Sequence, residues 1–106
     1  MEPFFTTVQD GPHTLVQFQT ESLMSTGDLE RIGQGLNRLV DEEKRQNVLL
    51  DFTKVRYLSS QAIGMIIRLH KKLLQSQGRL ELSGVSPQLL QLLKITKLDR
   101  VFKIRA

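Results

Sequence analysis

Residues 48–70 read VLLDFTKVRYLSSQAIGMIIRLH and contain the most informative pattern in the sequence. It opens with an uninterrupted apolar run at residues 48–50, which is typical of a strand buried at the centre of a parallel sheet. A short polar turn follows, and Ser59 and Ser60 then stand directly before apolar residues at helical spacing. The order predicts two hydroxyl groups at the start of a helix, just past the carboxyl end of a central strand. Open α/β sheets meet their ligands and partners in that position.

The two serines have two interpretations. The N-terminus of a helix offers free backbone N–H groups and about half a positive charge, so it favours a bound or covalent phosphate. The plainer interpretation is helix capping, because a serine cap typically stabilises a protein by about 1 kcal/mol. The same N–H groups attract a hydroxyl and a phosphate, so one site can serve both roles.

The flanking sequence supplies the other elements. Residues 4–8 and 15–18 read as strands joined by the turn signal Asp10-Gly11-Pro12, which predicts a hairpin. A helix is expected behind a capping box, Ser25-x-x-Asp28, and the helix after Ser60 is expected to end near residue 76 with Gly78 as its C-cap. Residues 80–82 read as a strand, Ser86-Pro87 as the start of a third helix and residues 101–104 as a last strand. The order ββαβαβαβ predicts an α/β fold with a mixed sheet of four or five strands and helices mainly on one face.

Two residues test this assignment. Leu49 should be buried in the central strand and Ile66 in the apolar stripe of the following helix. Replacing Leu49 by Ala should then cost about 2–5 kcal/mol of stability.

Composition limits the possible functions. A chain of 106 residues fits one domain, residues 1–106, and the absence of cysteine excludes disulfides and thiolate metal sites. The sequence has no apolar run of about 20 residues that would span a membrane, and residues 1–3 lead into a strand without the pattern of a leader. These features favour a cytoplasmic protein. The formal charge of +4 is read as a solvated basic surface.

The residue types that enzymes need do not occur together. The histidines, His13 and His70, stand far apart, and His70 falls in an apolar helical stripe, which favours a structural role. The sequence contains no phosphate-binding glycine loop, dinucleotide fingerprint or zinc-protease motif. It also has no Trp, and its Phe and Tyr residues lie in or beside predicted strands rather than in a nucleic-acid-binding pattern. We therefore expect no enzyme activity, no cofactor, no metal and no nucleic-acid partner.

Residues 51–67, DFTKVRYLSSQAIGMII, resemble the signature of STAS domains, the fold of bacterial anti-sigma factor antagonists. Residues 95–104, ITKLDRVFKI, are similar to the end of that family. The sequence departs from the family pattern at three positions. Ser59 stands where the family usually has Asp, Gln61 where it has a second hydroxyl residue, and Ala62 where it has Gly. Ser60 keeps a hydroxyl at a family hydroxyl position.

The resemblance implies a partner switch. The unphosphorylated domain would bind a serine kinase that is also an anti-sigma factor, and phosphorylation would break that complex. Ser60 is the expected main acceptor and Ser59 the secondary one. The expected contact surface, with its residues exposed, comprises Tyr57, Leu58, Ser59, Ser60, Gln61, Ala62 and Met65.

The alternative that the resemblance leaves open is a constitutive STAS scaffold subunit of a lipid transporter or a stress-sensing assembly. Gln61 favours this alternative if its position is the true acceptor, since a glutamine side chain cannot be phosphorylated.

Overall fold

The computed structural model describes residues 4–105, so the expectation about a leader at residues 1–3 lies outside the described residues. The strands of the main sheet are β1 (Phe5–Asp10), β2 (His13–Phe18), β4 (Asn47–Asp51), β6 (Arg79–Ser83) and β7 (Lys103–Ile104). The helices are α1 (Thr26–Asp41), α2 (Ser60–Gln75), α3 (Pro87–Ile95) and the short 3₁₀ helix η1 (Leu98–Arg100). Two further strands, β3 (Ser22–Leu23) and β5 (Tyr57–Leu58), form a separate parallel pair.

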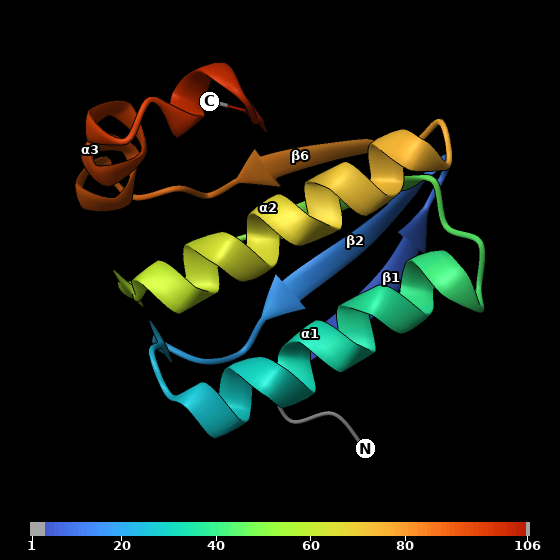
Figure 1. Cartoon of the computed structure of the whole chain (residues 1–106), viewed down its shortest axis with the longest axis horizontal. Helices are drawn as coiled ribbons and strands as arrows, with labels where there is room; N and C mark the ends of the chain where they lie inside the picture. The colour runs from blue at the N-terminus through green and yellow to red at the C-terminus, as the bar shows by residue number, and fades with distance from the viewer. Residues whose placement is uncertain (1–3, 106) are drawn as a thin grey trace.

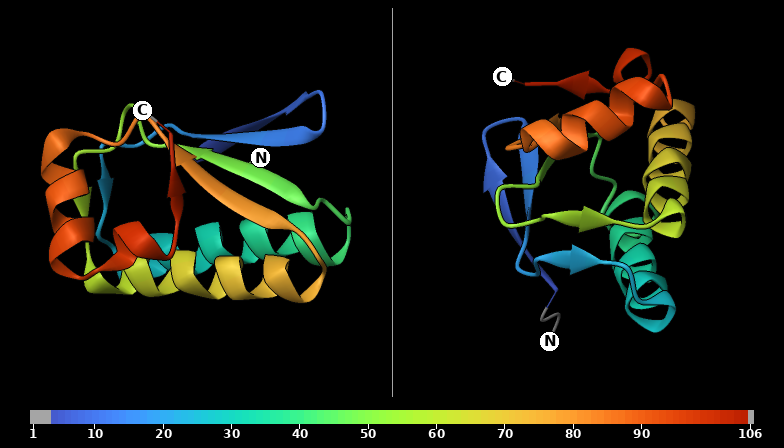
Figure 2. Two further views of the ribbon diagram at one scale, coloured as in Figure 1. Left: turned by 90° about the horizontal axis from the view of Figure 1, so that it is seen from above. Right: turned by 90° about the vertical axis from the view of Figure 1, so that its left-hand side faces the viewer.

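The main sheet has the order β1-β2-β4-β6-β7, with β4 at its centre. β1 runs antiparallel to β2, and every other neighbouring pair is parallel. Figure 1 shows α1 and α2 side by side in front of the strands. In the left view of Figure 2 both helices lie on one side of the sheet and α3 stands at its end. The predicted mixed sheet with helices mainly on one face is confirmed.

The two faces of the sheet carry different side chains because successive residues of a strand point to opposite sides. Val16, Leu50 and Leu82 share one row across three strands, and all three are buried beneath the helices. The opposite face has the row Val8, Leu15, Leu49, Glu81 and Lys103. Leu49 is 9% exposed and Ile66 is 2% exposed, so the expected burial of both is confirmed.

The last strand is shorter than its sequence predicts. Of residues 101–104, only Lys103 and Ile104 pair with β6, whereas residues 98–100 form η1 and the N–H of Phe102 donates to the Leu98 carbonyl. The ring of Phe102 is buried against His70, with 5.4 Å between the ring centroids. Packing of this aromatic ring against α2 therefore overrides the strand propensity of residues 101 and 102.

The end of α2 also differs from expectation. The helix ends at Gln75 with Ser76 as its C-cap, and the left-handed backbone conformation falls on Gln77, with φ of 62°. Gly78 serves a different purpose, because a Cβ at this position would overlap the Gln46 carbonyl. A glycine here permits close approach of two backbones rather than a left-handed turn.

The start of α1 is predicted correctly, but the reason is not. Ser25 is the N-cap residue, as expected, yet its side chain makes no capping hydrogen bond. Five apolar residues of α1 are buried at helical spacing, which shows that packing of this face rather than a capping box fixes the helix. They are Leu29, Ile32, Leu36, Leu39 and Val40.

Candidate functional site

A hydrogen-bonded turn leads from the central strand to the two serines. The Asp51 Oδ1 atom, at the end of β4, accepts bonds from the N–H and the hydroxyl of Thr53, at 2.9 and 2.5 Å, and its Oδ2 atom accepts one from Gln17 at 3.2 Å. Partial burial by itself raises the pKa of the Asp51 carboxyl, but these bonds and the charge of Lys54 together lower the pKa below its ordinary value. Asp51 is therefore an ionised anchor for the turn.

A glycine from another loop makes room for this turn. Gly84 follows β6 with φ of 65°, and a Cβ there would overlap the Thr53 hydroxyl oxygen. The parallel register pairs Asp51 with Ser83, the residue before Gly84. The motif after β4 and the loop after β6 thus fit together only with glycine at position 84.

The short pair β3–β5 then holds the chain in place up to the start of α2. The Arg56 N–H donates to the Glu21 carbonyl at 2.7 Å, and the Ser59 N–H donates to the Leu23 carbonyl at 3.1 Å. An exposed ion pair between Arg56 and Glu21 at 3.2 Å joins the same two segments. Residues before α1 and residues before α2 therefore form one continuous surface.

Ser59 and Ser60 have different surroundings. Ser59 is the N-cap of α2, half-buried, and its Oγ atom accepts the Ala62 N–H at 3.1 Å. Ser60 is the first helical residue, and its side chain is exposed. The first turn of α2 contains no acidic residue that would neutralise the positive end of the helix. The sequence did not show which serine caps the helix and which has an accessible hydroxyl. In the structure Ser59 is the cap, and Ser60 has the accessible hydroxyl.

Gln61 joins the two helix starts. Its Oε1 atom accepts a hydrogen bond from the Thr26 hydroxyl at 3.1 Å, and Thr26 is the first residue of α1. Gln61 is itself exposed. Gln61 therefore bridges the first turns of α1 and α2 at the surface of the site.

The expected contact residues do not all reach the surface. Tyr57 is 54% exposed, Ser60 and Gln61 are exposed, and Leu58 and Ser59 are half-buried. The expectation that Ala62 and Met65 are exposed is wrong, since both are buried. The reason is helical geometry: positions 62, 65, 66 and 69 share the α2 face that packs into the core. Met65 lies along a hollow of about 260 Å³ between α1 and α2 that Gln61 and Arg68 also line.

Met24 is a site residue that the sequence did not indicate. It follows β3 directly and is 51% exposed, which places a second large apolar side chain on the surface near Tyr57. The pairing of Leu23 with Leu58 and the bond from Ser59 to Leu23 bring Met24 beside the start of α2. A two-residue strand gives too little alternation to be found in a sequence, so only the fold reveals this neighbour.

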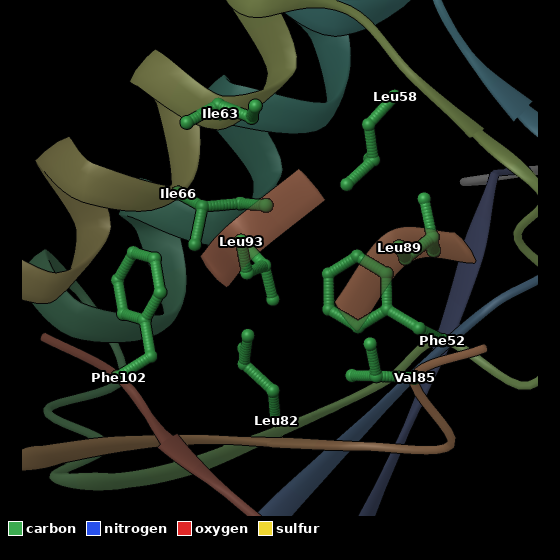
Figure 3. A pocket seen from close by; sticks show the side chains of 9 residues that line it. All are labelled: Phe52, Leu58, Ile63, Ile66, Leu82, Val85, Leu89, Leu93 and Phe102. Atoms are coloured by element: carbon green, nitrogen blue, oxygen red, sulfur yellow. The ribbon is translucent and has the colours of Figure 1, made fainter. Parts of the chain in front are cut away.

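The space beneath the site is packed with apolar side chains (Figure 3). Nine residues from β5, α2, β6, α3, the loops after β4 and β6, and the C-terminal segment line a cavity of about 10 Å³. A water molecule needs roughly that much room, and also polar partners, which the aliphatic and aromatic lining does not offer. This interior is a core contact between α2 and α3 rather than a ligand pocket. The lining residues are Phe52, Leu58, Ile63, Ile66, Leu82, Val85, Leu89, Leu93 and Phe102.

Within residues 4–105 no group of three or more His, Cys, Asp or Glu side chains is placed to hold a metal ion. Over the same residues no helix combines the length and the apolar character that crossing a bilayer requires.

The described residues thus form a one-sided α/β domain that presents an exposed serine at the start of the helix after its central strand. Residues 5–106 match the family model described as STAS domain, so the chain belongs to the STAS domain family. The resemblance of residues 51–67 and 95–104 to this family is thereby confirmed.

Individual relatives have related names. The anti-sigma-B factor antagonist of Listeria monocytogenes is 36% identical over 56 residues, which are 53% of this chain and 49% of the relative. The match thus spans about half the length of that curated relative. Among solved structures, an anti-sigma-factor antagonist (STAS) domain protein from Planctomyces limnophilus has a TM-score of 0.84 at 22% identity, covering 96% of this chain and 88% of its own. The Bacillus cell fate determinant SpoIIAA in its phosphorylated form has a TM-score of 0.74 at 14% identity, covering 96% and 91%. At these identities the structural similarity establishes the fold.

Proposed function

We propose that this chain is an anti-sigma factor antagonist. It binds an anti-sigma factor that is also a serine kinase, and phosphorylation of Ser60 by that partner breaks the complex. Membership of the STAS family and the name of the Listeria relative support the proposal. The chain acts by binding alone, and the partner supplies the catalytic residues.

The observation that carries the proposal is the position of Ser60. Its hydroxyl is exposed, whereas the Ser59 hydroxyl is occupied by the cap bond to Ala62. Ala62 and Ile63 already donate their N–H groups to Ser59, which leaves those of Ser60 and Gln61 at the open end of the helix. A phosphate on Ser60 would lie near these donors and near the positive end of the helix dipole, so the modified domain should keep its fold.

The same phosphate would oppose binding. It adds about −1.5 to −2 charges and a hydrated group between the exposed apolar side chains of Met24 and Tyr57 and the partner. Burying such a charge without a cationic partner costs several kcal/mol, and each 1.4 kcal/mol changes a dissociation constant about tenfold. The affinity should therefore fall by about 100-fold or more.

The proposed contact surface comprises Met24, Tyr57, Leu58, Ser59, Ser60 and Gln61. Ala62 and Met65 support it from beneath, since both are buried. Tyr57 and Met24 are the expected anchors, because large side chains near the centre of a contact contribute most of its energy.

Binding of the anti-sigma factor from the native host, measured by isothermal titration calorimetry, tests the proposal. Ser60→Asp imitates a phosphate only in part, with one charge and two oxygens, and should weaken binding about tenfold. Ser60→Ala should bind as the wild type does and resist the switch. Gln88→Asp is the matched control, because Gln88 is exposed and also lies in the first turn of a helix without an acidic residue, α3.

Two results would decide against the switch. Equal binding by wild type and Ser60→Asp, or an equal loss caused by Gln88→Asp, would favour the constitutive scaffold instead.

A further inference from the structure

The outer edge of β1 is the surface that the fold leaves open. β1 is the first strand in the sheet order, and among residues 4–105 only β2 pairs with it. The Gln19 N–H donates to the Phe4 carbonyl, which makes this the first hydrogen-bonded pair of the antiparallel ladder. Such pairs alternate along a ladder, so Thr6, Val8 and Asp10 direct their backbone groups toward β2. Phe5, Thr7 and Gln9 direct theirs outward.

Apart from the charge of Asp10 at its end, this edge lacks the features that usually prevent strands from pairing. Its six residues, FTTVQD, include no Lys and no Pro, and the register with β2 is continuous, without a bulge. Val8 is 52% exposed and extends the row of Leu15 and Leu49 to the margin of the sheet. The Arg45 guanidinium donates to the Gln9 Oε1 atom at 2.6 Å, so this side chain has a partner within the monomer.

The charges at the two ends of this edge complement each other. Asp10, at one end, is exposed and has no ion pair among the described residues. At the other end Lys54 donates to the Gln19 side chain at 2.6 Å, and that side chain donates to the Thr6 hydroxyl at 3.3 Å. The Lys54 ammonium therefore lies near the start of β1. Among the described residues it forms no ion pair, although its charge attracts the Asp51 carboxylate over a longer distance.

We propose that β1 pairs antiparallel with β1 of a second copy of this chain, around a twofold axis at Thr7. In this register Thr7 faces Thr7, and Phe5 faces Gln9, so the outward N–H and carbonyl groups of both copies meet. Val8 of one copy then lies beside Thr6 of the other. Asp10 of each copy falls beside Phe4 of its neighbour, next to the Lys54 that lies along Gln19. The charge complementarity occurs twice, once at each end of the paired strands.

The association should be weak. Two six-residue strands bury less than the roughly 1,000 Å² of total surface that stable complexes need. We therefore expect a dissociation constant in the range of weak contacts, between roughly 10 µM and 1 mM. The proposal is independent of the anti-sigma role, since it requires neither Ser60 nor another protein.

Two measurements on the full chain test it. Sedimentation velocity between about 10 µM and 1 mM should show a shift from monomer to dimer over the range expected for a small interface. Amide hydrogen exchange followed by NMR should show protection of Phe5, Thr7 and Gln9 that rises with concentration. Thr6 and Val8 are internal controls, because their N–H groups already bond to β2 in the monomer and should not change.

Charge reversal tests the register. Asp10→Lys or Lys54→Asp alone should weaken the dimer about fivefold or more, because two pairs become repulsive. The double variant Asp10→Lys/Lys54→Asp should restore the affinity to within about twofold. Glu30→Lys, on the exposed side of α1, is the matched control and should have no effect.

A monomer at about 1 mM would overturn the proposal, since even a weak strand-edge interface should associate there. So would self-association without added protection at Thr7, or a double variant as weak as the single ones.

Discussion

Leu49 and Leu50 are neighbours in one strand, and the structure predicts unequal costs for replacing them by Ala. The Leu50 side chain is fully buried between Val16 and Leu82 under the helices, so its removal leaves a closed cavity. Leu→Ala changes of this kind cost about 3–5 kcal/mol. Leu49 points to the face that carries no helix, between Leu15 and Glu81, where water can enter the space that is left. Leu49→Ala should lower the free energy of unfolding by about 1–2 kcal/mol, mainly because the removed carbons no longer contribute the free energy of burial away from water.

Urea unfolding followed by circular dichroism measures both variants against the wild type. Leu50→Ala should lower the urea midpoint further than Leu49→Ala, while the dependence of the unfolding free energy on urea stays the same in both variants. The melting temperature of Leu50→Ala should be roughly 10 °C below that of Leu49→Ala. The value of about 2–5 kcal/mol expected for Leu49 from its sequence is lowered here because one face of the sheet is open. Equal shifts, or a larger shift for Leu49→Ala, would refute the assignment of the two faces.

Three further perturbations have expected outcomes. Ser59→Ala removes the acceptor of the Ala62 N–H and should lower the free energy of unfolding in urea by about 1 kcal/mol. Ser60→Ala should lower it by less than about 0.5 kcal/mol. The reverse order would mean that Ser60 is the cap. Gly78→Ala should lower the free energy of unfolding by more than about 2 kcal/mol because the new Cβ overlaps the Gln46 carbonyl. Gly27→Ala places its Cβ in open space within α1 and should be neutral or stabilising. Similar effects of the two changes would contradict this packing. Burial alone raises the pKa of Glu81, but hydrogen bonds and charges of Arg105 and Lys103 hold the pKa below its ordinary value. Because the folded state binds this proton less readily than the unfolded state, the contribution of Glu81 is present above pH of about 4.3 and is lost as the pH falls through the folded pKa. The melting temperature should therefore fall between about pH 5 and pH 3, less steeply in Glu81→Gln, and an unchanged slope would exclude this role.

The sequence predicts those parts of the fold that depend on local pattern. The unbroken apolar run at residues 48–50 correctly indicates the central strand, and the apolar residues at helical spacing after Ser60 indicate α2. Ser86-Pro87 marks the start of α3, where the Ser86 hydroxyl accepts the Leu89 N–H at 3.2 Å. In each case one short segment contains enough information to select its structure.

The features that the sequence does not predict depend on contacts between distant segments. Gly78 resembles a C-cap in sequence, but its constraint comes from Gln46, more than thirty residues earlier. β3 and β5 are two residues long and exist because each completes the other, so Met24 could not be placed beside Ser59 in advance. The burial of Ala62 and Met65 follows from which face of α2 meets α1, which only the assembled fold decides.

Binding of the phosphorylated protein by its partner is the decisive measurement for the proposed switch at Ser60. The chain would be phosphorylated by its partner kinase, the modified residue mapped by mass spectrometry, and the affinity of modified and unmodified protein for the anti-sigma factor compared by calorimetry. The expected outcome is phosphate at Ser60, an unchanged fold by circular dichroism, and an affinity lower by about 100-fold or more. Phosphate found only at other residues, or equal affinity of the two forms, would contradict it.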